Sequence, residues 1–131
     1  MTAATTLLIG LGSNWHATAN LRAAETALRN LLPSLRLSTP QWTAPLQNSG
    51  PDYLNAVAAA TTQLPPEAIA VALKAIERQL GRTARRDAIC IDLDLLDYGG
   101  LELPHLRLPR RDLLALPFFR DPSRRLLANA P

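Results

Sequence analysis

Two aspartates placed two residues apart are the clearest chemical signal in this sequence. Asp92 and Asp94 alternate with Ile91, Leu93 and Leu95, and this alternation predicts a strand with both carboxylates on one face. Their Cα atoms would be roughly 7 Å apart, close enough for both carboxylates to hold one hard cation or a pair of them. Their mutual repulsion costs free energy unless a cation or arginines neutralise it. A solvated strand face paired with arginines is the alternative interpretation.

Basic residues flank this acidic strand on both sides. Cations beside a metal-binding carboxylate pair suit phosphoryl transfer, because the transferred group carries several negative charges. Taken singly, each of these residues is better explained as an exposed turn residue, and the sequence has no Walker-type glycine loop. The residues are Arg82, Arg85 and Arg86 before the strand, and His105, Arg107, Arg110 and Arg111 after it.

Composition narrows the class of protein. The chain has 131 residues, 47% hydrophobic and 19% charged, which predicts one domain over residues 1–131 with a substantial core. No apolar run reaches the ~18–20 residues of a membrane span, and the apolar start lacks signal-peptide features, so we expect a soluble, unprocessed protein without a membrane partner. Cys90 is the only cysteine, which excludes an intramolecular disulfide and favours a reducing, cytoplasmic compartment.

The basic balance indicates an anionic ligand. Thirteen arginines and one lysine face eleven carboxylates, and the pI is about 9.8. Arginine suits bidentate recognition of phosphate, on a small molecule or on a nucleic acid. An RNA-binding ferredoxin-like domain is therefore one hypothesis. Against it, the predicted central strands expose no aromatic pair for base stacking, and aromatic residues make up only 5% of the chain.

Hydrophobic periodicity predicts the elements that position these residues. Strands are expected at residues 5–11, 35–42, 53–63 and 89–96, and helices at 21–31 and 66–80, the second ended by Gly81. This order is that of an α+β, ferredoxin-like βαββαβ sandwich, an antiparallel sheet with two helices on one face. Four prolines in the tail predict only short helices there, around residues 110–116 and 123–129.

Taken in order, the motifs resemble the 6-hydroxymethyl-7,8-dihydropterin pyrophosphokinase family. The resemblance runs from about residue 8 to residue 117, and it implies a ferredoxin-like fold and a transferase that moves pyrophosphate from ATP to the hydroxymethyl group of a dihydropterin, giving AMP, in folate or related pterin biosynthesis. The matching segments are LGSN at 11–14, WTAPL at 42–46, PDYLNAV at 51–57, IE at 76–77, GR at 81–82, IDLDLLDYG at 91–99, and LPH at 103–105 with Arg111 six residues later.

The resemblance also implies a role for individual residues. Tyr53 would pack on the pterin ring and Asn55 would hydrogen-bond its edge, since an aromatic face and a fixed amide suit a flat heterocycle. Asp92 and Asp94 would hold two Mg²⁺ ions that bridge the ATP phosphates and the pterin hydroxyl. Thr43, Ala44, Pro45, Leu46 and Leu113 would complete the pterin pocket, while Glu77, Arg82, Arg85, Arg86, His105 and Arg111 would form the ATP side, with Arg82 also catalytic.

Three departures from the family pattern are visible. Only nine residues separate Arg82 from Asp92, without the usual Trp-Gly-Pro-Arg run; Ile89 stands where an arginine is usual, and Leu113 where a phenylalanine commonly covers the pterin. A shorter loop predicts weaker exclusion of water and leaves Arg85 or Arg86 to replace the missing arginine. The alternative function is a relative that binds pterin or nucleotide without transferring anything.

Overall fold

The computed structural model describes residues 3–46, 50–81 and 88–129. Arg82, Arg85 and Arg86 therefore lie outside the described residues. The elements in chain order are β1 (Thr5–Ser13), α1 (Ala17–Leu31), β2 (Arg36–Leu37), β3 (Gln41–Thr43), β4 (Tyr53–Thr62), α2 (Pro66–Leu80), β5 (Asp92–Tyr98), a 3₁₀ turn η1 (Pro104–Leu106), α3 (Arg111–Leu114) and α4 (Pro117–Ala128).

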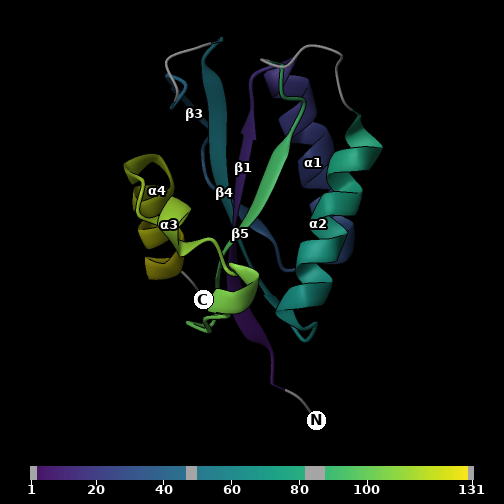
Figure 1. Ribbon diagram of the computed structural model, residues 1–131, viewed down its shortest axis with the longest axis vertical. Helices are drawn as coiled ribbons and strands as arrows, with labels where there is room; N and C mark the ends of the chain where they lie inside the picture. Colours follow the sequence, from purple (N-terminus) through teal and green to yellow (C-terminus); the bar gives the residue numbers. More distant parts are fainter. Residues whose placement is uncertain (1–2, 47–49, 82–87, 130–131) are drawn as a thin grey trace.

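The strands form one antiparallel sheet in the order β2-β4-β1-β5, with β3 pairing with β4 beyond the end of β2. Helices α1 and α2 cover one face, as the ferredoxin-like prediction requires, and α3 and α4 cover the other face (Figure 1). No helix among the described residues is long and apolar enough to cross a membrane. The α+β fold prediction is confirmed.

The central strand β1 serves two different layers. Leu7, Ile9 and Leu11 are fully buried in the larger core under α1 and α2. On the opposite face, Leu8 joins a smaller core that Phe119 of α4 completes. Side chains alternate between the two faces of a strand, so one nine-residue segment holds both layers together.

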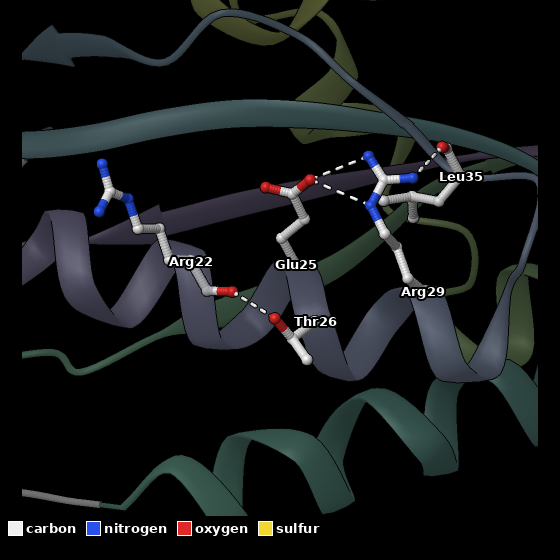
Figure 2. A network of polar contacts seen from close by, with 5 residues as sticks. All are labelled: Arg22, Glu25, Thr26, Arg29 and Leu35. Atoms are coloured by element: carbon white, nitrogen blue, oxygen red, sulfur yellow. Dashed lines mark hydrogen bonds and ion pairs between the residues drawn. The ribbon is translucent and has the colours of Figure 1, made fainter.

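The sequence explains where α2 begins and ends and how α1 is held to the chain that follows it. Helix α2 begins with Pro66 at its first position and ends at Gly81, whose φ of 99° favours glycine. Helix α1 is tied to the chain that follows it, because Arg29 donates to the Leu35 carbonyl at 2.8 Å while pairing with Glu25 at 2.9 Å (Figure 2). Both partners of that ion pair are partly exposed, so the pair orients the chain more than it stabilises it.

The predicted strand at residues 35–42 is wrong as a single element. It is divided into β2 and β3, and the register against β4 gains one residue between them, since Leu37 opposes Ala58 but Gln41 opposes Asn55. Pro40 interrupts the ladder here because proline has no N–H to donate. Ser38 bridges the gap, donating its N–H to the Val57 carbonyl and accepting the Val57 N–H at its hydroxyl.

The C-terminal segment is more helical than its prolines predicted. The expected short helix near residues 123–129 is wrong, because α4 runs over Pro117–Ala128. Pro117 occupies the first helical position, where no N–H is needed, and Pro122 is accommodated inside the helix as a buried apolar residue. The other predicted tail helix is reduced to one turn, α3.

Docking of α4 on the sheet depends on Phe119. We expect Phe119→Ala to lower the free energy of unfolding by about 3 kcal/mol, because the ring is 6% exposed and its removal leaves a cavity against β1. Urea unfolding followed by circular dichroism measures this. Leu127→Ala is the control on the same helix, since Leu127 is 45% exposed; equal losses in the two variants would contradict the packing argument.

Candidate active site

A pocket of about 380 Å³ lies between the sheet and the C-terminal segment. Its walls come from β1, the segment after β3, the start of β4, the start of β5, and the α3–α4 region. No histidine or cysteine is among the described residues that line it. The lining residues are Gly12, Asn14, Thr43, Ala44, Pro45, Leu46, Tyr53, Asn55, Ile89, Asp92, Asp94, Leu113, Leu116, Phe118 and Phe119.

The pocket exists because β1 presents glycine where it separates the two functional strands. Gly12 pairs with Asn55 on one side and with Asp92 on the other, and Gly10 likewise pairs with Asp94. A Cβ at Gly12 would lie 2.9 Å from Asn55 Oδ1, and one at Gly10 would lie 3.0 Å from Phe119 Cζ. A side chain at either position would therefore collide with a wall of the pocket or fill its floor.

The amide and the aromatic ring predicted to recognise a heterocycle stand together on β4. Asn55 is 6% exposed and donates from Nδ2 to Thr43 Oγ1 at 2.6 Å. Thr43 belongs to β3, the neighbouring strand, so the side-chain contact crosses the ladder and fixes the amide. Tyr53 lines the same pocket. Burial raises the pKa of its hydroxyl, and the negative charge of Asp92 raises that pKa further by a smaller effect.

The turn after β1 sets the position of the chain that leads into β5. Ile89 donates its N–H to Asn14 Oδ1 at 2.5 Å, and its carbonyl accepts from the Asn14 N–H at 3.1 Å and from Ser13 Oγ at 3.2 Å. The predicted start of the strand at residue 89 is therefore wrong. Ile89 bonds to this turn, and the ladder begins at Asp92. In the sequence alone, the Gly-Ser-Asn motif predicts an ordinary turn. In the structure, its Ser13 and Asn14 hold the backbone of Ile89, three residues before Asp92.

Asp92 and Asp94 face the pocket, while Leu93 and Leu95 are buried under the helices, as predicted. Partial desolvation in the pocket raises the pKa of Asp92 to about 6, and the charges of Asp94 and Glu77 contribute to the rise. Desolvation also raises the pKa of Asp94, against the opposing effect of the Arg110 charge. Without a bound cation, the charge of Asp94 therefore opposes the ionisation of Asp92.

Helix α2 brings a charge pair to the edge of this acidic site. Lys74 Nζ lies 3.0 Å from the buried Glu77 Oε1, an ion pair without hydrogen-bond geometry. The positive charge of Lys74 lowers the pKa of both Asp92 and Asp94, whereas Glu77 raises that of Asp92. Lys74 was missed in the sequence, although its spacing of three residues from Glu77 places both on one side of the helix.

A second pocket of about 450 Å³ is lined by residues between 102 and 112 and carries arginines. Arg111 lines it and pairs with Glu102 at 3.4 Å and with Asp97 at 4.0 Å. Arg110 lines it too, although the resemblance gave that residue no role. His105 lies in η1, exposed, and lines neither pocket.

Every residue predicted for the pterin pocket lies in the first pocket together with the two aspartates. Leu113 is there, but aromatic side chains come from a place that the sequence did not indicate. Phe118 and Phe119 of α4 line the pocket and pack edge to face with ring centroids 4.8 Å apart. The sequence signal for them was the Phe-Phe pair after Pro117, but the short helices predicted around residues 110–116 and 123–129 left that pair outside any element.

The family profile described as 7,8-dihydro-6-hydroxymethylpterin-pyrophosphokinase (HPPK) matches residues 8–120. A 2-amino-4-hydroxy-6-hydroxymethyldihydropteridine pyrophosphokinase of Haemophilus influenzae is 33% identical, over 95% of this chain and 86% of that protein. The Pseudomonas putida protein of the same name is 39% identical over 77% of this chain and 90% of its own length. A mitochondrial folate synthesis bifunctional protein of Pisum sativum is 37% identical over 61% of this chain and 16% of its own length.

The match to the family covers β1 from residue 8 onward, all the other strands, both helices under the sheet, and every residue that lines the first pocket. Identity of a third or more with two bacterial relatives extends over most of each protein. The chain therefore belongs to the 7,8-dihydro-6-hydroxymethylpterin-pyrophosphokinase family.

Proposed function

We propose that this protein transfers the terminal pyrophosphoryl group of ATP to the hydroxymethyl group of a dihydropterin. In this reaction the hydroxyl oxygen forms a bond to the β-phosphorus and the bond from that phosphorus to the α–β bridging oxygen breaks. AMP leaves with the bridging oxygen, and the hydroxyl proton is released. The family membership and the names of the bacterial relatives support this activity.

One observation carries the proposal. Tyr53 and Asn55 on β4 and the aspartates on β5 face the same pocket across a strip of β1 that has no side chains. A flat heterocycle held by the β4 residues therefore directs its substituent toward Asp92 and Asp94 across a single strand, which is about 5 Å from each neighbour. Positioning of this kind is the main contribution that a protein makes to phosphoryl transfer.

The residues present fit magnesium. The pocket offers two carboxylates as hard oxygen ligands, and the described residues contain no group of three or more His, Cys, Asp or Glu that could form a complete protein site. Mg²⁺ is commonly held by one or two carboxylates together with substrate phosphates, so Asp92 and Asp94 would hold two such ions when ATP is bound. Bound Mg²⁺ neutralises the charge that develops on the phosphates.

We propose that the first pocket takes the pterin and that the arginine-lined second pocket takes the nucleotide. Thr43 holds Asn55 in place, and Ala44, Pro45, Leu46 and Leu113 supply apolar walls around Tyr53. Phe118 adds an aromatic wall that Leu113 does not supply. On the nucleotide side, Arg111 lines the second pocket, whereas Glu77 and His105 line neither pocket and are proposed to contact ATP outside it. Arg82, Arg85 and Arg86 lie outside the described residues.

The decisive experiment measures AMP formed from ATP and Mg²⁺ with and without 6-hydroxymethyl-7,8-dihydropterin. We expect AMP formation that depends on the pterin.

We expect Asp92→Asn and Asp94→Asn each to lower kcat/KM by about 10³-fold, because each removes a charged ligand from the site. Glu25→Gln is the control, since Glu25 pairs with Arg29 on α1, on the opposite face of the sheet. Unchanged activity in the Asp92→Asn, Asp94→Asn double variant would refute the proposed mechanism. Tight pterin binding without AMP would support the binding-only alternative.

Removal of the Tyr53 ring separates pterin binding from ATP binding. We expect Tyr53→Ala to raise the KM for the pterin about tenfold and to leave the KM for ATP unchanged, because the ring lines the pocket proposed for the pterin. Trp42→Ala is the matched aromatic control, since Trp42 is 60% exposed on neighbouring β3 and does not line the pocket. A Tyr53→Ala effect confined to the KM for ATP would contradict the assignment of the two pockets.

The acidic pair makes stability depend on pH in the absence of Mg²⁺. The pKa of Asp92 is raised to about 6 in the folded protein, so its contribution to stability is present below its ordinary pKa of 3.8 and is lost as pH rises through about 6. We therefore expect Asp92→Asn to gain thermal stability relative to the parent protein between pH 4 and pH 7.5. Added Mg²⁺ should reduce this difference, because it stabilises only the protein that retains both carboxylates. Calorimetry in EDTA measures the melting temperatures of the two proteins across this pH range. A difference in melting temperature that stays the same at every pH would contradict this expectation.

A further inference from the structure

The described part of the site lacks a cation at the place where the family pattern provides one. Ile89 lines the first pocket there, and its backbone is fixed by the Asn14 and Ser13 bonds. An apolar side chain on that wall cannot bind the charge of a phosphate group. Among the described residues, positive charge beside the aspartates therefore comes from other elements.

Two described cations act on the aspartates, and they come from opposite sides. Lys74 lies on α2, is paired with Glu77 and lines neither pocket. Arg110 lies just before α3 and lines the second pocket. Its backbone N–H donates to the Leu95 carbonyl at 2.6 Å, which attaches it to β5 at the residue that follows Asp94. Of these two cations, Arg110 alone lines the second pocket, and its backbone is held on β5 next to Asp94.

The guanidinium of Arg110 is already oriented by a carboxylate. Nε and Nη2 donate to the two oxygens of Asp112 at 3.1 and 3.0 Å, a fork-to-fork pair. A guanidinium has five N–H donors, so both N–H groups of Nη1 and one of Nη2 are not used by this pair. The side chain is 41% exposed, which leaves these donors within reach of a ligand in the second pocket.

We propose that Arg110 binds the phosphate chain of ATP where the second pocket approaches Asp94, and that Asp112 positions it for this contact. The inference rests on the proposed pyrophosphokinase function and identifies the arginine that takes over the role left vacant at Ile89. Arg110 contacts the transferred phosphates directly. Asp112 acts only through Arg110 and is a positioning residue.

The test uses paired variants of the whole chain. Arg120 and Asp121 on α4 form a similar pair at 3.0 Å with similar exposure, 42% for the arginine, and line neither pocket. Arg120→Gln is therefore the matched control for Arg110→Gln, and Asp121→Asn is the control for Asp112→Asn. Thermal melting of all four proteins verifies folding, and no change is expected, because these side chains are exposed or half-exposed.

We expect Arg110→Gln to lower kcat/KM for ATP about 100-fold and Arg120→Gln to leave it unchanged. Arg110→Lys should recover part of the loss, since lysine keeps the charge but lacks the planar fork. Asp112→Asn should cost about tenfold, mainly in kcat, because the guanidinium is present but less well oriented. Equal activity of Arg110→Gln and Arg120→Gln would overturn the proposal.

Direct binding separates this inference from the proposed reaction. Calorimetry with Mg²⁺ and α,β-methylene ATP, in which the bond to be broken is replaced, measures phosphate binding without turnover. We expect about 10- to 100-fold weaker binding by Arg110→Gln than by Arg120→Gln. If the parent protein makes no AMP but shows this difference, the proposed function fails while Arg110 stands. If the parent protein makes AMP and the two variants bind equally, Arg110 fails while the function stands.

Discussion

The site depends on a steric constraint at the central strand. One face of β1 must be apolar to hold the larger core, and the other face must carry no side chain at Gly10 and Gly12. Gly12 pairs with Asn55 on β4 and with Asp92 on β5 and leaves the floor between them open, while Gly10 leaves room for Phe119, which forms part of the pocket wall. The same alternation that buries Ile9 and Leu11 therefore determines that Asn55 and the two aspartates face a common pocket.

Electrostatic repulsion is the cost of that arrangement. Partial desolvation in the pocket, and then the negative charges of Asp94 and Glu77, raise the pKa of Asp92 to about 6. Lys74 and Arg110 reduce this repulsion from opposite sides but do not remove it. A site that is incompletely neutralised in this way favours a ligand that arrives with its own cations. On the proposed function, this is the physical reason why the acidic end of the first pocket would accept Mg²⁺ ions that arrive bound to the phosphates of the nucleotide.

Local patterns determined which features could be predicted. The order of the elements follows from periodicity, and the aspartates, Tyr53 and Asn55 lie in short motifs that can be identified without knowledge of the fold. The break between β2 and β3 depends on Pro40, and the start of β5 depends on Asn14, 75 residues away from Ile89. Neither feature could be read from alternation alone, because the backbone partners that decide them are set by tertiary packing.

The C-terminal segment shows most clearly why sequence reasoning reached only half of the site. Its prolines indicate interruption, yet Pro117 begins α4, and that helix brings Phe118 and Phe119 to the pocket. The preceding residues attach to β5 through the Arg110 backbone, which places a guanidinium next to a carboxylate 16 positions earlier in the chain. The two strand motifs contain Tyr53, Asn55 and the two aspartates, the residues proposed for the pterin and the metal. The arginine that we propose for the phosphate chain lies in a segment whose position is defined only once the sheet has formed, so no local pattern could have distinguished Arg110 from the other arginines.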